Sequence, residues 1–204
     1  MGQWASKGAL TLASALLVLG GGCTARDLPA AKIKVGEKMA DFTLPEAGGK
    51  QHSLYEFKGR KAVAVIFLAT KCPFSNAFNH IVAKLAREYA DRGVALVGIN
   101  SNKTEPAAEV AEHARSNGFS FPVLKDEGNV IADRLGAFVT PEVFLLDGDW
   151  TLRYHGALGN SQKPTTKAEE ATDAEFRPAL EAVLGGQTVA RAQTKAFGCT
   201  IKRI

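Results

Sequence analysis

The chain has 204 residues, with 46% hydrophobic and 23% charged residues, so it is long enough for one domain with a full core and is not wholly disordered. Its formal net charge is +4. This excess is spread along the chain without basic runs interleaved with aromatics, and we therefore expect no nucleic-acid partner.

Residues 1–22 have the pattern of a signal peptide. Lys7 supplies positive charge, and the apolar stretch 9–19 is shorter than the roughly 20 residues that span a bilayer. Three glycines and then Cys23 follow, which resembles the lipobox of bacterial lipoproteins, although the favoured leucine lies one position too far away. We expect an exported protein that is anchored through lipidated Cys23 to a bacterial membrane, on its periplasmic or cell-surface side. Cleavage after Ala25 and an uncleaved anchor are the alternatives.

The remaining chain divides into a linker over 23–35, a single domain over 36–184 and a tail over 185–204 that lacks strong periodicity. Hydrophobic patterning and turn residues predict the elements of the domain. Thr104 is expected to cap the predicted helix over 105–117. The predicted strands are 40–44, 62–69, 94–99, 121–124, 142–146 and 150–154, with a return segment at 51–57, and the predicted helices are 73–92, 105–117, 129–135 and 173–184.

The order of these elements predicts the fold class. The apolar run 62–69 has no polar interruption, which suits a central strand that is covered on both faces. Helices and strands alternate around it, and a strand pair follows before the last helix. The sequence therefore predicts an α/β sandwich with a mixed central sheet.

Cys72 lies where the strand 62–69 gives way to the first helix. Pro73 suits the first helical position, where its missing N–H is not needed, and this places Cys72 at the N-cap. Free N–H groups and the positive end of the helix dipole then favour a thiolate, as does the adjacent Lys71. Because the thiolate is the attacking form of cysteine, we expect Cys72 to be a nucleophile. The alternative is an inert, buried cysteine.

Five segments resemble one family. Lys-Cys-Pro-Phe-Ser at 71–75 is similar to the active-site turn of thioredoxin-fold proteins, and Val-Thr-Pro-Glu-Val-Phe at 139–144 is similar to their cis-proline segment. Residues 39–44 and 54–59 resemble the N-terminal extension of the redoxin branch (alkyl hydroperoxide reductase/thiol-specific antioxidant). Residues 195–203 resemble the closing segment of a peroxiredoxin-like subgroup.

This resemblance implies a thioredoxin-like, three-layer α/β/α sandwich with an N-terminal β extension. It also implies that Lys71, Pro73, Thr140 and Pro141 border a substrate groove facing Cys72. A cis peptide before Pro141 would leave the Thr140 backbone free to pair with an extended substrate. No organic cofactor and no metal are required.

The sequence departs from the family at three positions. A peroxiredoxin carries Thr or Ser three residues before its reactive cysteine and Pro four residues further back, whereas this chain has Ala69 and Val65. We therefore expect weak peroxidase activity. Ser75 replaces the second cysteine of thioredoxins, so a local disulfide is excluded and another thiol must resolve the reaction.

Cys199 is the candidate for that second thiol. If the tail folds back, a Cys72–Cys199 disulfide would close a loop of well over 100 residues and stabilise the fold by about 4–5 kcal/mol in the chain-entropy model. The bond could be redox-active or static, and the two cysteines could also remain unpaired. The choice stays open at this point.

The sequence thus predicts an exported thiol-disulfide oxidoreductase or weak thiol peroxidase. Its partners would be a disulfide-bearing protein or a peroxide as substrate, and an external thiol reductant. A non-catalytic binding module of the same fold and a metal-delivery protein are the alternatives. The four histidines show no ligand spacing, which disfavours metal delivery.

Overall fold

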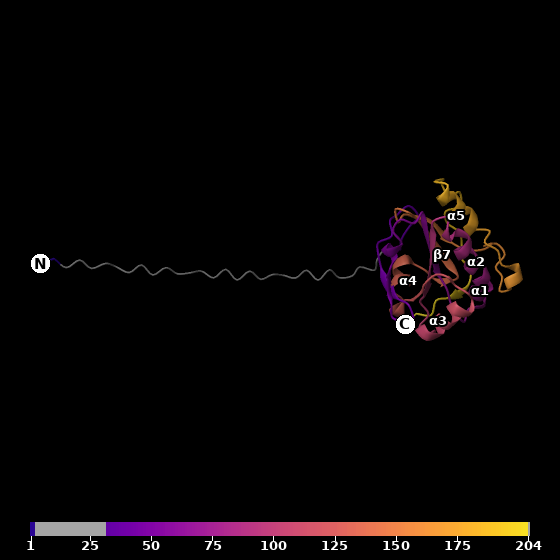
Figure 1. The fold of residues 1–204 in the computed structure, drawn as a ribbon, viewed down its shortest axis with the longest axis horizontal. Coiled ribbons are helices and arrows are strands. Elements are labelled where there is room, and N and C mark those ends of the chain that lie inside the picture. The colour runs from indigo at the N-terminus through magenta and orange to yellow at the C-terminus, as the bar shows by residue number, and fades with distance from the viewer. Residues whose placement is uncertain (3–31, 204) are drawn as a thin grey trace.

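The computed structural model describes residues 1–2 and 32–203 (Figure 1). Cys23 and nearly all of the expected signal peptide lie outside the described residues, so their assignments stay predictions. In the part of the chain that is described, no helix has the length and apolar character needed to cross a membrane.

A five-stranded mixed sheet forms the centre of the molecule. Its strand order is β5-β4-β3-β7-β8. The pairs β3–β4 and β4–β5 are parallel, whereas β3–β7 and β7–β8 are antiparallel. The predicted mixed sheet is confirmed. The strands are β3 (Ala62–Phe67), β4 (Val94–Asn100), β5 (Val123–Lys125), β7 (Glu142–Asp147) and β8 (Leu152–Gly156).

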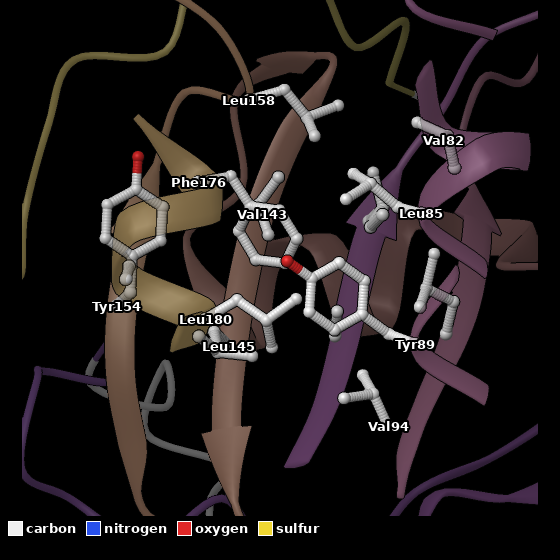
Figure 2. Packing of buried hydrophobic residues seen from close by; sticks show 14 of the residues in the cluster. Val82, Leu85, Tyr89, Val94, Val143, Leu145, Tyr154, Leu158, Phe176 and Leu180 are labelled. Carbon is white, nitrogen blue, oxygen red and sulfur yellow. The ribbon is translucent and has the colours of Figure 1, made fainter. Parts of the chain in front are cut away.

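The apolar run in β3 is continuous because both of its faces are covered. Side chains alternate across a strand, so Ala64 and Ile66 join one core cluster while Val65 and Phe67 join the other. In Figure 2, Tyr89 of α2 (Asn79–Ala90) and Phe176 of α5 (Phe176–Leu184) meet in the first of these clusters.

The second face of the sheet is covered by α4 (Val130–Leu135) and by an N-terminal hairpin. The hairpin consists of β1 (Thr43–Pro45), β2 (Gln51–Ser53) and a 3₁₀ turn at Leu54–Phe57. Tyr55 stacks on Trp150 with ring centroids 4.5 Å apart, which ties the hairpin to the turn before β8. The predicted layers and N-terminal β extension are therefore confirmed.

The helix α3 (Ala107–Ser116) begins later than the sequence predicts. Its N-cap is Pro106, with φ −61° and ψ 152°, and Thr104 does not cap it. A residue before proline avoids the helical region, so Glu105 cannot start the helix. The Thr104 carbonyl instead accepts a hydrogen bond from Lys71 Nζ at 3.1 Å.

Several other boundaries differ from the prediction. Trp150 has φ 68° and belongs to the turn, so β8 starts at Leu152. The first predicted helix is divided at Phe78 into α1 (Pro73–Ala77) and α2, and α5 starts at Phe176 instead of Asp173.

The C-terminal tail folds back and pairs with the segment before β7. Its residues form β9 (Cys199–Thr200), which pairs with β6 (Val139–Thr140) in a separate antiparallel pair. Figure 1 shows the C-terminal end near α3 and α4, and Lys103 N donates to Lys202 O at 3.0 Å. A two-residue strand carries too little periodicity to be predicted.

Candidate active site

Cys72 is the N-cap of α1, as the sequence predicts. Its backbone is extended, with φ −90° and ψ 116°, and Pro73 occupies the first helical position. Ser75 N in the first turn donates to Cys72 Sγ at 3.4 Å. Cys72 is only 2% exposed, so its sulfur is covered by the chain around it.

A buried carboxylate holds the turn that leads into Cys72. Thr70 N and Lys71 N donate to the two oxygens of Glu105 at 2.9 and 3.1 Å. Asn100 Nδ2 donates to the same side chain at 2.6 Å, and Glu105 is 2% exposed. β3 and β4 are parallel neighbours, so the segments after their carboxyl ends meet at one sheet edge. Sequence analysis missed Glu105, and an acidic residue shortly after a buried strand was the available signal.

Lys71 and Ser75 take different parts in this turn. The ammonium of Lys71 lies 2.9 Å from Glu109 Oε2 on α3, and its side chain is 58% exposed. The positive charge expected to favour a Cys72 thiolate is therefore shared with a carboxylate. Ser75 is fully buried, and its hydroxyl accepts a hydrogen bond from Ala69 N at 3.0 Å. Position 75 is where thioredoxins have their second cysteine, and here its hydroxyl holds the backbone that leads into Cys72.

The peptide bond between Thr140 and Pro141 is cis, as the resemblance implied. Thr140 is 1% exposed, and its carbonyl accepts a hydrogen bond from the Cys72 thiol at 3.2 Å. The groove residues predicted from distant parts of the sequence therefore lie together. Among the described residues, the buried Thr140 hydroxyl oxygen has no hydrogen-bond partner.

Glu142 fixes the backbone before this proline. Its Oε2 accepts from Phe138 N at 2.7 Å and from Val139 N at 3.2 Å. Its Oε1 lies 2.6 Å from Nε2 of His155, whose ring stacks on Phe144. Glu142 is 5% exposed. Sequence analysis assigned Glu142 to a strand and did not identify this anchoring role.

Cys199 lies directly beside Cys72. Its backbone N donates to Cys72 Sγ at 3.3 Å, and both cysteines are free thiols. The pKa of the Cys199 thiol is raised to about 11, first by burial and then by the hydrogen bond and charge of Cys72. With this pKa, Cys199 is protonated at neutral pH, and because the thiolate is the attacking species, it is not the better nucleophile of the two in this state.

An apolar pocket adjoins the two cysteines. Phe74 and Phe78 contribute from the Cys72 side, Pro141 from the cis-proline segment and Phe197 from the tail, with Leu158 from the segment after β8. Within the described residues, no group of three His, Cys, Asp or Glu side chains could hold a metal ion.

Known proteins resemble this chain in sequence and in structure. Thiol-disulfide oxidoreductase ResA of Halalkalibacterium halodurans is 31% identical over 114 residues, which are 56% of this chain and 63% of that protein. The match thus spans less than two thirds of that relative. A thioredoxin-like protein of Bacillus subtilis is 32% identical over 116 residues, covering 56% of this chain and 66% of that protein.

Solved structures match over more of the chain. A hypothetical protein from Sinorhizobium meliloti superposes with a TM-score of 0.79 and 38% identity, over 85% of this chain and 96% of that chain. Peroxidoxin BcpB from Mycobacterium tuberculosis gives a TM-score of 0.57 at 25% identity, over 76% of this chain and 97% of that one. The model of the AhpC/TSA family matches residues 35–155, which is more than half of the sequence. The expected redoxin resemblance is thereby confirmed, and the chain belongs to the AhpC/TSA family.

Proposed function

We propose that this protein is an exported thiol-disulfide oxidoreductase in which Cys72 is the nucleophile and Cys199 the resolving thiol. The observation that supports this most is the contact between the two residues, in which Cys199 N donates to Cys72 Sγ at 3.3 Å. The name of the ResA relative supports the same chemistry. The signal-like sequence of residues 1–22 supports export, with a lipid on Cys23 as the membrane anchor.

In the first step, the Cys72 thiolate attacks one sulfur of a substrate disulfide. A bond forms between Cys72 Sγ and that sulfur, the substrate disulfide breaks, and the departing sulfur takes up a proton. The first-turn N–H of Ser75 and the helix dipole stabilise the negative sulfur before the attack. Lys71 and Pro73 border the attacking sulfur, and Thr140 and Pro141 align the substrate.

In the second step, Cys199 attacks Cys72 Sγ. Its proton goes to solvent, the mixed disulfide breaks, and the second substrate sulfur leaves as a thiol. The pKa of about 11 belongs to the state in which both cysteines are free of disulfides. Once Cys72 is in a disulfide, its charge no longer raises the pKa of Cys199, which makes the resolving thiolate easier to form. The substrate has then gained two electrons, and an external dithiol reduces the Cys72–Cys199 disulfide.

A peroxide is the second substrate that we propose, with slow turnover. The Cys72 thiolate would take one oxygen to become a sulfenic acid and release water or an alcohol, and Cys199 would then condense with it and release a second water. Ala69 has no hydroxyl to position the peroxide, and its backbone N is bound to Ser75. The lack of this hydroxyl supports a low rate of peroxide turnover.

Disulfide reduction by the purified protein tests the proposal. We expect wild type to reduce insulin disulfides with dithiothreitol as the reductant, Cys72→Ser to be inactive, and Cys199→Ser to accumulate a mixed disulfide. Mass spectrometry of the oxidised wild type should show a Cys72–Cys199 crosslink. Activity that survives in Cys72→Ser, or two unlinked thiols after oxidation, would contradict the mechanism.

A further inference from the structure

The tail occupies the backbone edge that an extended substrate would need. Thr140 pairs with Cys199, and Val139 pairs with Thr200, in antiparallel register. Strand addition to such an edge is a general way to bind a peptide. The site facing Cys72 therefore already holds a polypeptide segment, and that segment belongs to the same chain.

The fit at Gly198 is specific to glycine. A Cβ atom at this position would lie 1.8 Å from the Thr140 carbonyl oxygen, which no side chain can tolerate. Phe197, one residue earlier, lines the apolar pocket together with Phe74 and Pro141. The segment Phe197-Gly198-Cys199 thus presents an aromatic side chain, a close backbone contact and a thiol to three successive parts of the site.

The segment is fixed on both sides of Cys199. Upstream, the Thr194 hydroxyl accepts from Ala157 N at 3.0 Å and contacts the Tyr154 hydroxyl at 2.7 Å. Downstream, Ile201 is 3% exposed, and Arg203 donates to Asp133 at 2.7 Å. We call residues 194–203 the strap. It crosses the site with an anchor at each end.

We propose that the strap is the resident occupant of a polypeptide-binding site, and that a partner protein reaches Cys72 by replacing it. The replacing segment would be extended and would carry an aromatic residue two positions before a cysteine, as the strap does. That this cysteine belongs to a disulfide rests on the proposed function. The exposed fraction of Cys72, 2%, supports displacement because no second chain can approach the sulfur while the strap is in place.

A peptide with the sequence of residues 194–202 tests the inference. It carries serine in place of Cys199 so that binding is noncovalent, and a fluorescent label reports its anisotropy. The full-length variant Gly198→Ala should bind this peptide at least about tenfold more tightly than wild type, because the added Cβ expels the strap from its site. A peptide with Phe197→Ala should bind the same variant at least about tenfold more weakly.

The variant Gly185→Ala is the matched control. It lies at the start of the same tail, where an added Cβ has only ordinary contacts, the nearest at 3.4 Å from Glu181 O. It should bind the peptide as weakly as wild type does. Circular dichroism checks that each variant is folded. If Gly198→Ala does not fold, Arg203→Ala replaces it, because this change removes the hydrogen bonds of the downstream anchor and the contact of its guanidinium with the Phe138 ring.

Equal peptide affinity in wild type and the strap-releasing variant would overturn the inference, and equal binding of the two peptides would overturn the role of the aromatic residue. Binding does not depend on turnover. Tight, Phe-dependent binding by a protein that reduces no disulfide would therefore count against the proposed function and in favour of the strap.

Discussion

Replacing Glu105 by glutamine tests whether a buried carboxylate holds the active-site turn. The carboxylate accepts three N–H groups, from Thr70, Lys71 and Asn100. An amide offers one oxygen and one NH₂ group. In its better orientation the oxygen keeps the Thr70 and Asn100 donors, which share Oε2, and the NH₂ then opposes the N–H of Lys71.

The expected cost follows from these contacts. A buried donor without an acceptor costs about 1–3 kcal/mol, and the remaining hydrogen bonds lose their charged acceptor. Burial lowers the pKa of Lys125, which is 6% exposed, and the negative charge of Glu105, which opposes this shift, is lost in the variant. We expect a loss of about 2–3 kcal/mol in the free energy of unfolding, which lowers Tm by about 4–12 °C in a chain of this size.

Thermal unfolding monitored by circular dichroism measures this loss, and Glu109→Gln is the control. Glu109 also binds Lys71, but their side chains are 37% and 58% exposed. An ion pair that exposed contributes little to stability, so this variant should unfold close to wild type. A Tm for Glu105→Gln equal to that of Glu109→Gln would refute the reasoning from burial.

Two further results are expected from the charged and titrating groups. In Cys72→Ala, the pKa of Cys199 should fall from about 11 because the hydrogen bond and charge of Cys72 are removed and only burial still raises it; iodoacetamide should then alkylate Cys199 at least about twofold faster at pH 8, and an unchanged rate would contradict this. The pKa of Glu181 is lowered to about 2 by its hydrogen bonds from Arg92 and then Tyr89. The stability that it contributes is therefore complete above its unfolded pKa of about 4.3 and is lost as the pH falls towards 2. The difference in urea stability between wild type and Glu181→Gln should accordingly be smaller at pH 3 than at pH 7, and a constant difference would show that this carboxylate does not titrate as the structure requires.

The junction between strand and helix at Cys72 could be predicted from the sequence because its signals are local. The apolar run of β3, the proline at the first helical position and the amphipathic pattern that follows lie within about thirty residues. The cis bond before Pro141 also came from a local motif, through its resemblance to a family. Each of these features depends on neighbours in sequence, which is where pattern reasoning is strongest.

The supports of the site could not be predicted in the same way. Glu105 contacts Thr70 across 35 residues, and this contact exists only because β3 and β4 are parallel neighbours. The strap has a similar dependence, because its two-residue strand carries no alternation and it pairs with residues about sixty positions away, in close backbone contact at Gly198. Hydrophobic periodicity cannot report a hydrogen bond or a single backbone contact between segments that are distant in the sequence.

The separation of the two cysteines in the sequence has a consequence during synthesis of the protein. Cys199 follows Cys72 by 127 residues, and a chain is synthesised from its N-terminus. Cys72 and the residues of its helix are thus synthesised before the strap, which contacts the Cys72 sulfur through Cys199 N. Every new molecule therefore passes through a period in which Cys72 has been made and the strap has not, and we expect other disulfides to reach its sulfur most easily then.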